Sequence, residues 1–232
     1  MGKIDEIRKL YYDPKQGLTN PRKLHEKLKE KGISLKEIKE FVDRQEVGQK
    51  YRYKPNKKDQ WYPITAPSFS YQIDLIFYPK TKRINLGYDT ALTAIEITSR
   101  MGYVIPIKGK GKTELIKAMK QFIEKSGVSG KKGFIMSDRG SEFKSRQFKG
   151  LMEEHGIVHW MADGGDHTKM GQIETFNRAV KRFVSKYQSM YKTKKFVDII
   201  NDLIYNYNNT VYSSTGYKPS EVGEEERYAI RQ

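Results

Sequence analysis

The sequence contains no cysteine and only four histidines, His25, His155, His159 and His167. Without cysteine the chain can form neither a disulfide nor a thiolate zinc site. The histidines also lack the paired spacing of zinc ligands. No zinc is therefore expected, and any catalytic metal would have to be bound mainly by carboxylates.

Long apolar runs are also missing. No segment approaches the roughly 20 residues that a membrane-spanning helix needs. The N-terminal stretch MGKIDEIRKL lacks the apolar core of a signal peptide. We therefore expect an intracellular protein that makes no use of a membrane.

Acidic residues are too few to balance the basic ones: 28 Asp and Glu stand against 44 Lys and Arg, a net charge of +16. Such an excess attracts a polyanion, because binding releases condensed counterions. Nucleic acid is the first partner to consider. The alternatives are a basic protein that is merely soluble and one that binds an anionic membrane surface. The 232 residues, 37% of them hydrophobic, suffice for one ordinary domain and a small companion.

Residues 1–49 are predicted to form a small helical domain. Leu24, Leu28 and Ile33 precede the segment SLKEIKEFVDRQ, whose apolar residues recur at helical spacing. Asn20, followed by Pro21, and Ser34 are suitable N-caps for two helices. Two short helices around a tight turn favour a helix-turn-helix-like DNA-binding domain. A helical module for protein contacts explains the pattern equally well.

Residues 50–67, KYRYKPNKKDQWYPITAP, are predicted to be an extended basic linker. The segment has no hydrophobic period, carries three prolines and mixes Lys and Arg with Tyr and Trp. Such a strip can lie along phosphates while its rings stack. Equally, it can be a solvated tether with Trp61 docked on the next domain.

Residues 68–222 alternate predicted strands and helices. The strand candidates are SYQIDLIFY, INLGYDTALTAIEIT, GYVIPIK, GFIMSD and IVHWMA; the helix candidates are TELIKAMKQFIEKSG, SRQFKGLMEEHG, QIETFNRAVKRFVSKYQSMY and FVDIINDLIYNYNN. Three strands followed by helix, strand, helix, strand and helix is the order of the ribonuclease H-like fold. We therefore expect an α/β domain with a mixed five-stranded sheet flanked by helices. Residues 223–232 are expected to be a frayed acidic tail.

Three carboxylates stand where this element order would bring them together. Asp74 interrupts an apolar strand, and burying an unpaired carboxylate costs several kcal/mol unless a cation or donors compensate. Asp138 follows the fourth strand, at the carboxyl end of the strand, where α/β proteins place their sites. A single Asp at a strand end is, however, often only a turn residue. Glu174 begins the next long helix. Asp89 and Glu96, on neighbouring strands, are interpreted as structural.

Basic residues follow Glu174 on its helix. Arg178 and Lys181 lie four and seven residues later and share its face, with Arg182 next to them and Lys169 just before the helix. This arrangement favours a carboxylate at a metal with cations holding DNA phosphates beside it. The alternative is an exposed helix stabilised by a Glu–Arg pair, worth a few tenths of a kcal/mol.

The flanks of the three carboxylates resemble one family. Between Asp138 and Glu174 lie 35 residues. The segments IMSDRGSEF, KMGQIETFNRAVKR and YNNTVYSSTGYKPSEV resemble the SDxGxEF, KNGxxExxNRxxKR and YNxxxHxxTGxxPxE boxes of the D,D(35)E core of retroviral integrases, retrotransposon integrases and related transposases. The N-terminal segment LYYDPKQGLTNPRKLHEKLKEKGISLKEIKEFVDRQ looks most like integrases of Maverick/Polinton elements and virophages.

The sequence departs from this family in three places. It lacks the His-His-Cys-Cys zinc module, so no zinc role is carried over. It has Tyr212 where the closing box often has His, and Asp-Gly-Gly-Asp where a Pro-containing loop is common.

The resemblance implies a DNA integrase. Asp74, Asp138 and Glu174 would hold two Mg²⁺ or Mn²⁺ ions, and the enzyme would process the 3′ ends of a mobile element or viral DNA and join them to target DNA. Double-stranded DNA and a homo-oligomer are the implied partners, and the nucleus of a eukaryotic host is the expected location. The alternatives are an RNase H-like nuclease that only cuts and a DNA-binding protein of integrase descent.

Overall fold

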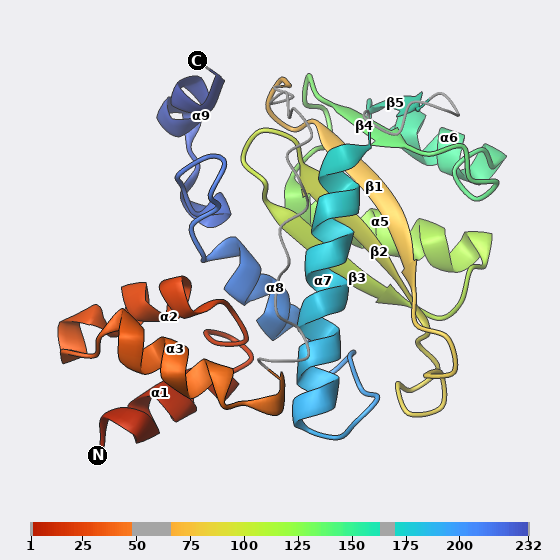
Figure 1. Ribbon diagram of the computed structural model, residues 1–232. Helices are drawn as coiled ribbons and strands as arrows, with labels where there is room; N and C mark the ends of the chain where they lie inside the picture. Colours follow the sequence, from red (N-terminus) through yellow and green to blue (C-terminus); the bar gives the residue numbers. More distant parts are fainter. Residues whose placement is uncertain (1, 48–65, 163–169, 232) are drawn as a thin grey trace. The chain divides into compact units, whose positions relative to one another are not determined.

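The computed structural model describes residues 2–47, 66–162 and 170–231 (Figure 1). Most of the expected linker, residues 50–65, therefore lies outside the described part. The chain forms two compact units. The smaller comprises Met1–Tyr62 and Val180–Asn206, and the larger comprises Pro63–Ala179 and Tyr207–Gln232.

The larger unit is built on a five-stranded sheet. Its strands are β1 (Tyr71–Phe77), β2 (Thr90–Glu96), β3 (Gly102–Ile107), β4 (Phe134–Ser137) and β5 (Val158–Met161). They lie in the order β3-β2-β1-β4-β5. The pairs β1–β2 and β2–β3 are antiparallel, whereas β1–β4 and β4–β5 are parallel. The predicted mixed five-stranded sheet is thereby confirmed.

Helices cover the two faces of this sheet, because successive side chains of a strand point to opposite sides. From β1, Tyr71, Ile73 and Leu75 enter a core shared with α5 (Lys112–Ser126) and α6 (Arg146–Glu154). Gln72 and Asp74 alternate with them and contact the first turns of α7 (Gly171–Met190). In Figure 1 this part of α7 and α5 lie on opposite faces of the sheet.

Gly102 lets α7 approach β3 closely. A Cβ atom at this position would lie 2.4 Å from Cε2 of Phe176 and 3.2 Å from Cε1 of Tyr207. The amide of Asn208, the last residue of α8 (Ile200–Asn208), bonds the Gly102 peptide twice, at 2.9 Å and 2.8 Å. A side chain at residue 102 is excluded by this packing.

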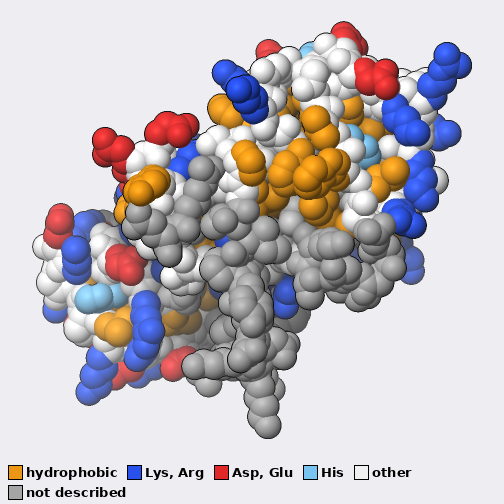
Figure 2. Space-filling model, turned by 90° about the horizontal axis from the view of Figure 1, so that it is seen from above, with side chains coloured by type: hydrophobic (Ala, Val, Ile, Leu, Met, Phe, Trp, Pro, Cys, Tyr) orange, Lys and Arg blue, Asp and Glu red, His pale blue; other side chains and the backbone are white. Residues whose placement is uncertain are grey.

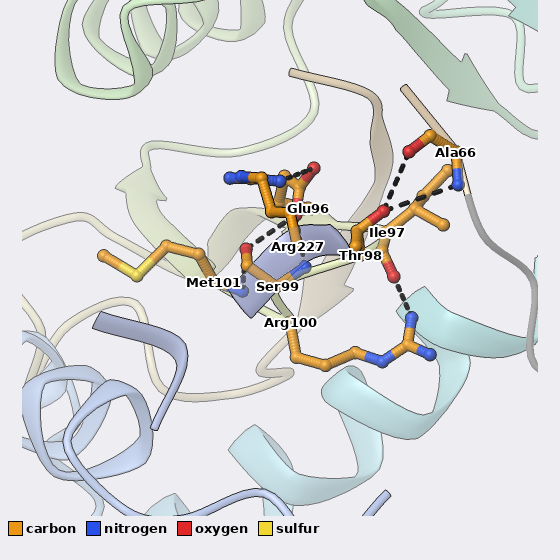
Figure 3. A network of polar contacts seen from close by, with 8 residues as sticks. All are labelled: Ala66, Glu96, Ile97, Thr98, Ser99, Arg100, Met101 and Arg227. Atoms are coloured by element: carbon orange, nitrogen blue, oxygen red, sulfur yellow. Dashed lines mark hydrogen bonds and ion pairs between the residues drawn. The ribbon is translucent and has the colours of Figure 1, made fainter. Parts of the chain in front are cut away.

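The chain's last described segment is helical. After the short 3₁₀ helix η2 (Pro219–Glu221), α9 spans Glu224–Arg231. Arg227 of α9 donates to Glu96 at 2.8 Å, and Ser99 donates to the same carboxylate through its backbone N–H and its hydroxyl (Figure 3). The expectation of a frayed tail was wrong, because this ion pair with a residue 131 positions away fixes the helix.

The smaller unit contains α1 (Lys3–Tyr12), α2 (Pro21–Leu28), the 3₁₀ helix η1 (Lys29–Lys31) and α3 (Leu35–Asp43). The predicted caps are confirmed: Asn20 accepts from the N–H of Lys23, and Ser34 forms a capping box with Glu37. Helix α1 was not predicted from the sequence. These helices enclose a core of Ile7, Tyr11, Leu24, Leu28, Ile33, Ile38, Phe41 and Val42.

The division between the units differs from the predicted boundaries at 49 and 68. Lys186 of α7 donates to the carbonyl of Leu18 at 2.8 Å, and Asn206 of α8 donates to that of Gly17 at 2.7 Å. The second half of α7 and most of α8 therefore belong with the N-terminal helices. Among the described residues no helix has the length and apolar character that crossing a membrane requires.

Candidate active site

Asp74 lies in the middle of β1, and its carboxylate accepts hydrogen bonds from two neighbours. The backbone N–H of Leu75 donates to Oδ1, and the side-chain amide of Asn177 donates to Oδ2, both at 2.7 Å. Two residues earlier, Gln72 accepts from the N–H of Ile173 at 2.9 Å. The face of β1 that carries Asp74 is thus fixed against the first turns of α7.

Asp138 directly follows β4, the parallel neighbour of β1. Its side chain is exposed, and Oδ1 accepts from the N–H of Gly140 at 2.9 Å. In the register between these strands Tyr71 is opposite Ile135 and Gln72 is opposite Met136. Continued two residues further, the same offset relates Asp74 to Asp138, which lies one residue beyond the end of β4.

Glu174 lies in the first turn of α7, and its side chain is exposed. It comes one residue after Ile173, whose N–H bonds β1, and three residues before Asn177, whose amide bonds Asp74. The stretch of α7 that contacts β1 is therefore the stretch that carries Glu174.

The structure brings these three positions to neighbouring elements but does not gather their carboxylates. Among the described residues, no three acidic or histidine side chains are close enough together to hold a metal ion. The two aspartates accept hydrogen bonds from protein donors instead, as described above. The arrangement of the backbone agrees with a shared site, whereas the side chains of Asp74 and Asp138 bond other partners.

The oxygen atoms of these side chains are suitable ligands for a hard divalent cation. Each of the three side chains offers carboxylate oxygens, which Mg²⁺ and Mn²⁺ prefer. Asn177 adds a neutral oxygen: its Oδ1 atom is buried and has no hydrogen-bond partner, while its Nδ2 atom donates to Asp74. A buried oxygen without a donor is unfavourable unless a cation or water satisfies it.

The basic residues expected beside the site are found on the surface of α7. Arg178, Lys181 and Arg182 are exposed, with Arg178 one turn after Glu174. Lys169 lies outside the described residues, as do Gly164 and Gly165. The helix therefore presents acidic and then basic side chains along its length.

The two other carboxylates of the sheet have structural partners. Glu96 is 1% exposed and held by Arg227 and Ser99 (Figure 3). Asp89 accepts from the hydroxyl of Thr90 at 3.2 Å and lies 4.0 Å from the ammonium of Lys82. Their interpretation as structural residues agrees with these contacts.

Asn177 and Gln72 were not predicted as site residues, although simple spacing could have indicated both. Asn177 follows Glu174 by three residues and shares its helix face, and Gln72 precedes Asp74 by two residues and shares its strand face. Gln172, 1% exposed with neither amide atom bonded, is a third buried polar residue at this place.

The chain is similar to known proteins both in sequence and in fold. No family model matches the sequence. A transposon-derived protein of Caenorhabditis elegans is 28% identical over 141 residues, which are 61% of this chain and 48% of that protein. The chain thus spans about half the length of this relative.

A chain in the cryo-EM structure of the simian T-cell lymphotropic virus intasome, in complex with PP2A regulatory subunit B56 gamma, is similar in fold. The TM-score is 0.60 at 17% sequence identity, and the match covers 88% of this chain and 76% of that one. The chain is therefore related to a transposon-derived protein and shares its fold with a chain of a retroviral intasome.

Proposed function

We propose that this chain is a DDE integrase, of the D,D(35)E kind and most like those of Maverick/Polinton elements and virophages. It would process the 3′ ends of a mobile element or viral DNA and join them to target DNA. The transposon-derived relative and the fold shared with an intasome chain support an enzyme of this class.

One observation carries the proposal. Asp74 lies in β1, Asp138 directly follows β4, the parallel neighbour of β1, and Asn177 ties Asp74 to the turn of α7 that begins with Glu174. With Glu174 in the first turn of α7, this arrangement of the backbone supports a shared site for three carboxylates from separate parts of the sequence.

Asp74, Asp138 and Glu174 are the residues that would hold two Mg²⁺ or Mn²⁺ ions. When bound, such a pair stabilises both the attacking and the leaving oxygen of an in-line phosphoryl displacement. Asn177 orients Asp74 through its hydrogen bond. Arg178, Lys181, Arg182 and Lys169 would neutralise phosphates of the bound DNA.

The proposed chemistry needs no nucleophile from the protein. Water attacks a phosphodiester near the element's end and releases a strand with a free 3′-hydroxyl. That hydroxyl then attacks a phosphodiester of the target: its oxygen bonds to phosphorus while the target's own 3′-oxygen leaves. The substrate is double-stranded DNA, at least a dimer acts on two ends, and the nucleus of a eukaryotic host is the expected location.

The test is strand transfer of a labelled duplex oligonucleotide in Mg²⁺ or Mn²⁺. Asp138→Asn should keep the fold and lower the rates of both cutting and joining by at least ~100-fold. Loss of a metal ligand should lower the rates more than loss of a residue that only orients a ligand, which costs about 10–100-fold. Asp198→Asn is the matched control, since Asp198 makes only an exposed ion pair with Lys195.

Three results would contradict the proposal. Activity of Asp138→Asn within tenfold of the unchanged protein would exclude this site. Cutting without joining would identify a nuclease of the same fold. Binding of DNA with neither reaction would identify a DNA-binding protein.

A further inference from the structure

The edge strand β5 exposes large apolar side chains. Val158, Trp160 and Met161 are 54%, 53% and 39% exposed. β5 ends the sheet order, with β4 as its one neighbour among the described strands. Exposed apolar residues on a sheet edge are unfavourable in water and mark a surface that binds something.

Trp160 forms one wall of a shallow hollow at this edge. The hollow has a volume of about 440 Å³ and is lined by Arg139, Lys144, His159, Trp160 and Met161. This is within the size range of small-ligand sites. In Figure 2 hydrophobic side chains gather on the surface beside a histidine and a series of Lys and Arg side chains, the same combination of residue types.

The indole ring of Trp160 is held in a fixed orientation. It stacks on Phe134 of β4, with ring centroids 4.6 Å apart and an interplanar angle of 19°. A ring that is stacked on one side and still half exposed presents its other side to solvent. A second flat ring can therefore stack there without loss of conformational entropy in the tryptophan.

The charges around this ring favour an anion. Arg139 and Lys144 are exposed, and none of the five lining residues is acidic. His159 bonds the hydroxyl of Ser137 at 2.9 Å. Burial and the nearby Lys149 lower the pKa of His159, so its imidazole is neutral at pH 7.

A flat aromatic surface with cations beside it is the usual way in which proteins hold single-stranded nucleic acid. The hollow also adjoins the proposed catalytic site, because Arg139 directly follows Asp138 in the chain. Resting on the function proposed above, we propose that it binds one unpaired nucleotide of the DNA substrate. The base stacks on Trp160, and the phosphate lies between Arg139 and Lys144.

Tryptophan fluorescence tests this proposal. The sequence has two tryptophans, so Trp61→Phe leaves Trp160 as the only reporter. This variant is titrated, with divalent cations chelated, with a blunt duplex and with the same duplex carrying a short single-stranded extension. The extension should quench the fluorescence of Trp160, because a stacked base quenches indole, and the blunt duplex should change it little.

Binding measurements on further variants make the test specific. Trp160→Ala should weaken binding of the extended duplex about 5- to 150-fold and leave binding of the blunt duplex unchanged, because stacking contributes about 1–3 kcal/mol per base. Trp160→Phe should retain most of the affinity. Tyr228→Ala is the matched control, since it removes another exposed ring of the same unit.

Other outcomes overturn the subsite. Equal quenching by inorganic polyphosphate would mean a general anion surface, and concentration-dependent quenching without DNA would mean pairing of β5 with a second copy. An acidic peptide that competes with the extended duplex would mean a protein-binding surface. Joining that proceeds without quenching would contradict the nucleotide subsite alone. Quenching in a protein that never joins DNA would contradict the proposed function alone.

Discussion

The two units bury polar side chains in different ways. In the larger unit buried or half-buried carboxylates meet donors from other segments: Asp74 meets Asn177, and Glu96 meets Arg227. In the smaller unit buried donors meet carbonyls of one loop, since Lys186 bonds Leu18 and Asn206 bonds Gly17.

Helix α7 carries both oxygen ligands and basic side chains. Its first two turns offer oxygen atoms at the candidate site, and the turns from Arg178 onward offer cations, exposed at Arg178, Lys181 and Arg182 and buried at Lys186. A substitution in the first two turns should therefore affect reaction steps, whereas one from Arg178 onward should affect DNA binding or the stability of the smaller unit.

The largest expected effect is on stability, at the buried ion pair of the larger unit. Arg227→Met leaves Glu96, 1% exposed, without its cation. Breaking a buried pair costs about 3–5 kcal/mol, which lowers the melting temperature of a unit this size by on the order of 10 °C. Calorimetry measures this shift.

Arg146→Met, at an exposed arginine of α6, is the control and should melt normally. Adding Glu96→Gln to Arg227→Met should restore part of the stability, because a neutral amide is less unfavourable when buried. Equal melting of Arg227→Met and the unchanged protein would mean that α9 is not fixed by this pair.

The second largest effect is on the rates of cutting and joining. Asn177→Ala removes a donor from the carboxylate of Asp74, and residues that orient a metal ligand are worth 10–100-fold in affinity or activity. Cutting and joining should fall by about this factor while the affinity for DNA changes little. Asn201→Ala, at an exposed asparagine of α8, is the control and should change neither the rates nor the affinity. If the rate of Asn177→Ala depended less on metal concentration than that of the control, Asn177 would not be orienting a metal ligand.

Particular residues show how much of this could be foreseen. The alternation of β1, the short apolar run of β4 and the caps Asn20 and Ser34 are local signals, and the first two predicted Asp74 within a strand and Asp138 at the end of one. The bond of Gln72 to Ile173 and the ion pair of Glu96 with Arg227 join residues 101 and 131 positions apart. No local period predicts such contacts.

Two local patterns also left out what neighbouring elements do. The segment IVHWMA is a strand as predicted, but its pattern did not show that β5 lies at the sheet edge with its side chains largely exposed. The charged segment GEEERYAIRQ has the composition of a frayed end, yet Arg227 fixes it as helix. In both cases neighbouring elements, rather than the segment's own residues, determine the outcome.

The third effect is a pH dependence confined to the smaller unit. Burial lowers the pKa of Lys186 from 10.5 to about 8. Between these two values the unfolded chain binds more protons than the folded one, so the free energy of unfolding rises with pH, by up to about 3 kcal/mol.

Denaturant titrations between about pH 7.5 and 10.5 measure this rise. In Lys186→Met it should disappear, so that variant loses stability relative to the unchanged protein as the pH increases. Lys39→Met, at an exposed lysine of α3, should keep the rise. If the free energy of unfolding of Lys186→Met rose with pH in parallel with that of the unchanged protein, this lysine would not be the titrating group.

The smallest effect concerns the exposed cations of α7. Lys181→Glu should weaken DNA binding and reduce the slope of log K against log salt by about 1, because one DNA phosphate no longer has a cation beside it. The melting temperature should stay the same. Lys120→Glu, at an exposed lysine of α5, makes the same change of charge elsewhere, and equal slopes for the two variants would remove Lys181 from the DNA-binding surface.

The central claim, joining by a free DNA 3′-hydroxyl at a carboxylate site, is tested most directly with a donor duplex that is already cut. In Mn²⁺ a donor ending in a 3′-hydroxyl should join to target DNA without the first cut, and the same donor ending in hydrogen should not join at all. Because the protein supplies no nucleophile, none of it should remain covalently bound to DNA after denaturation. A stable covalent adduct that depends on one tyrosine or serine would contradict it.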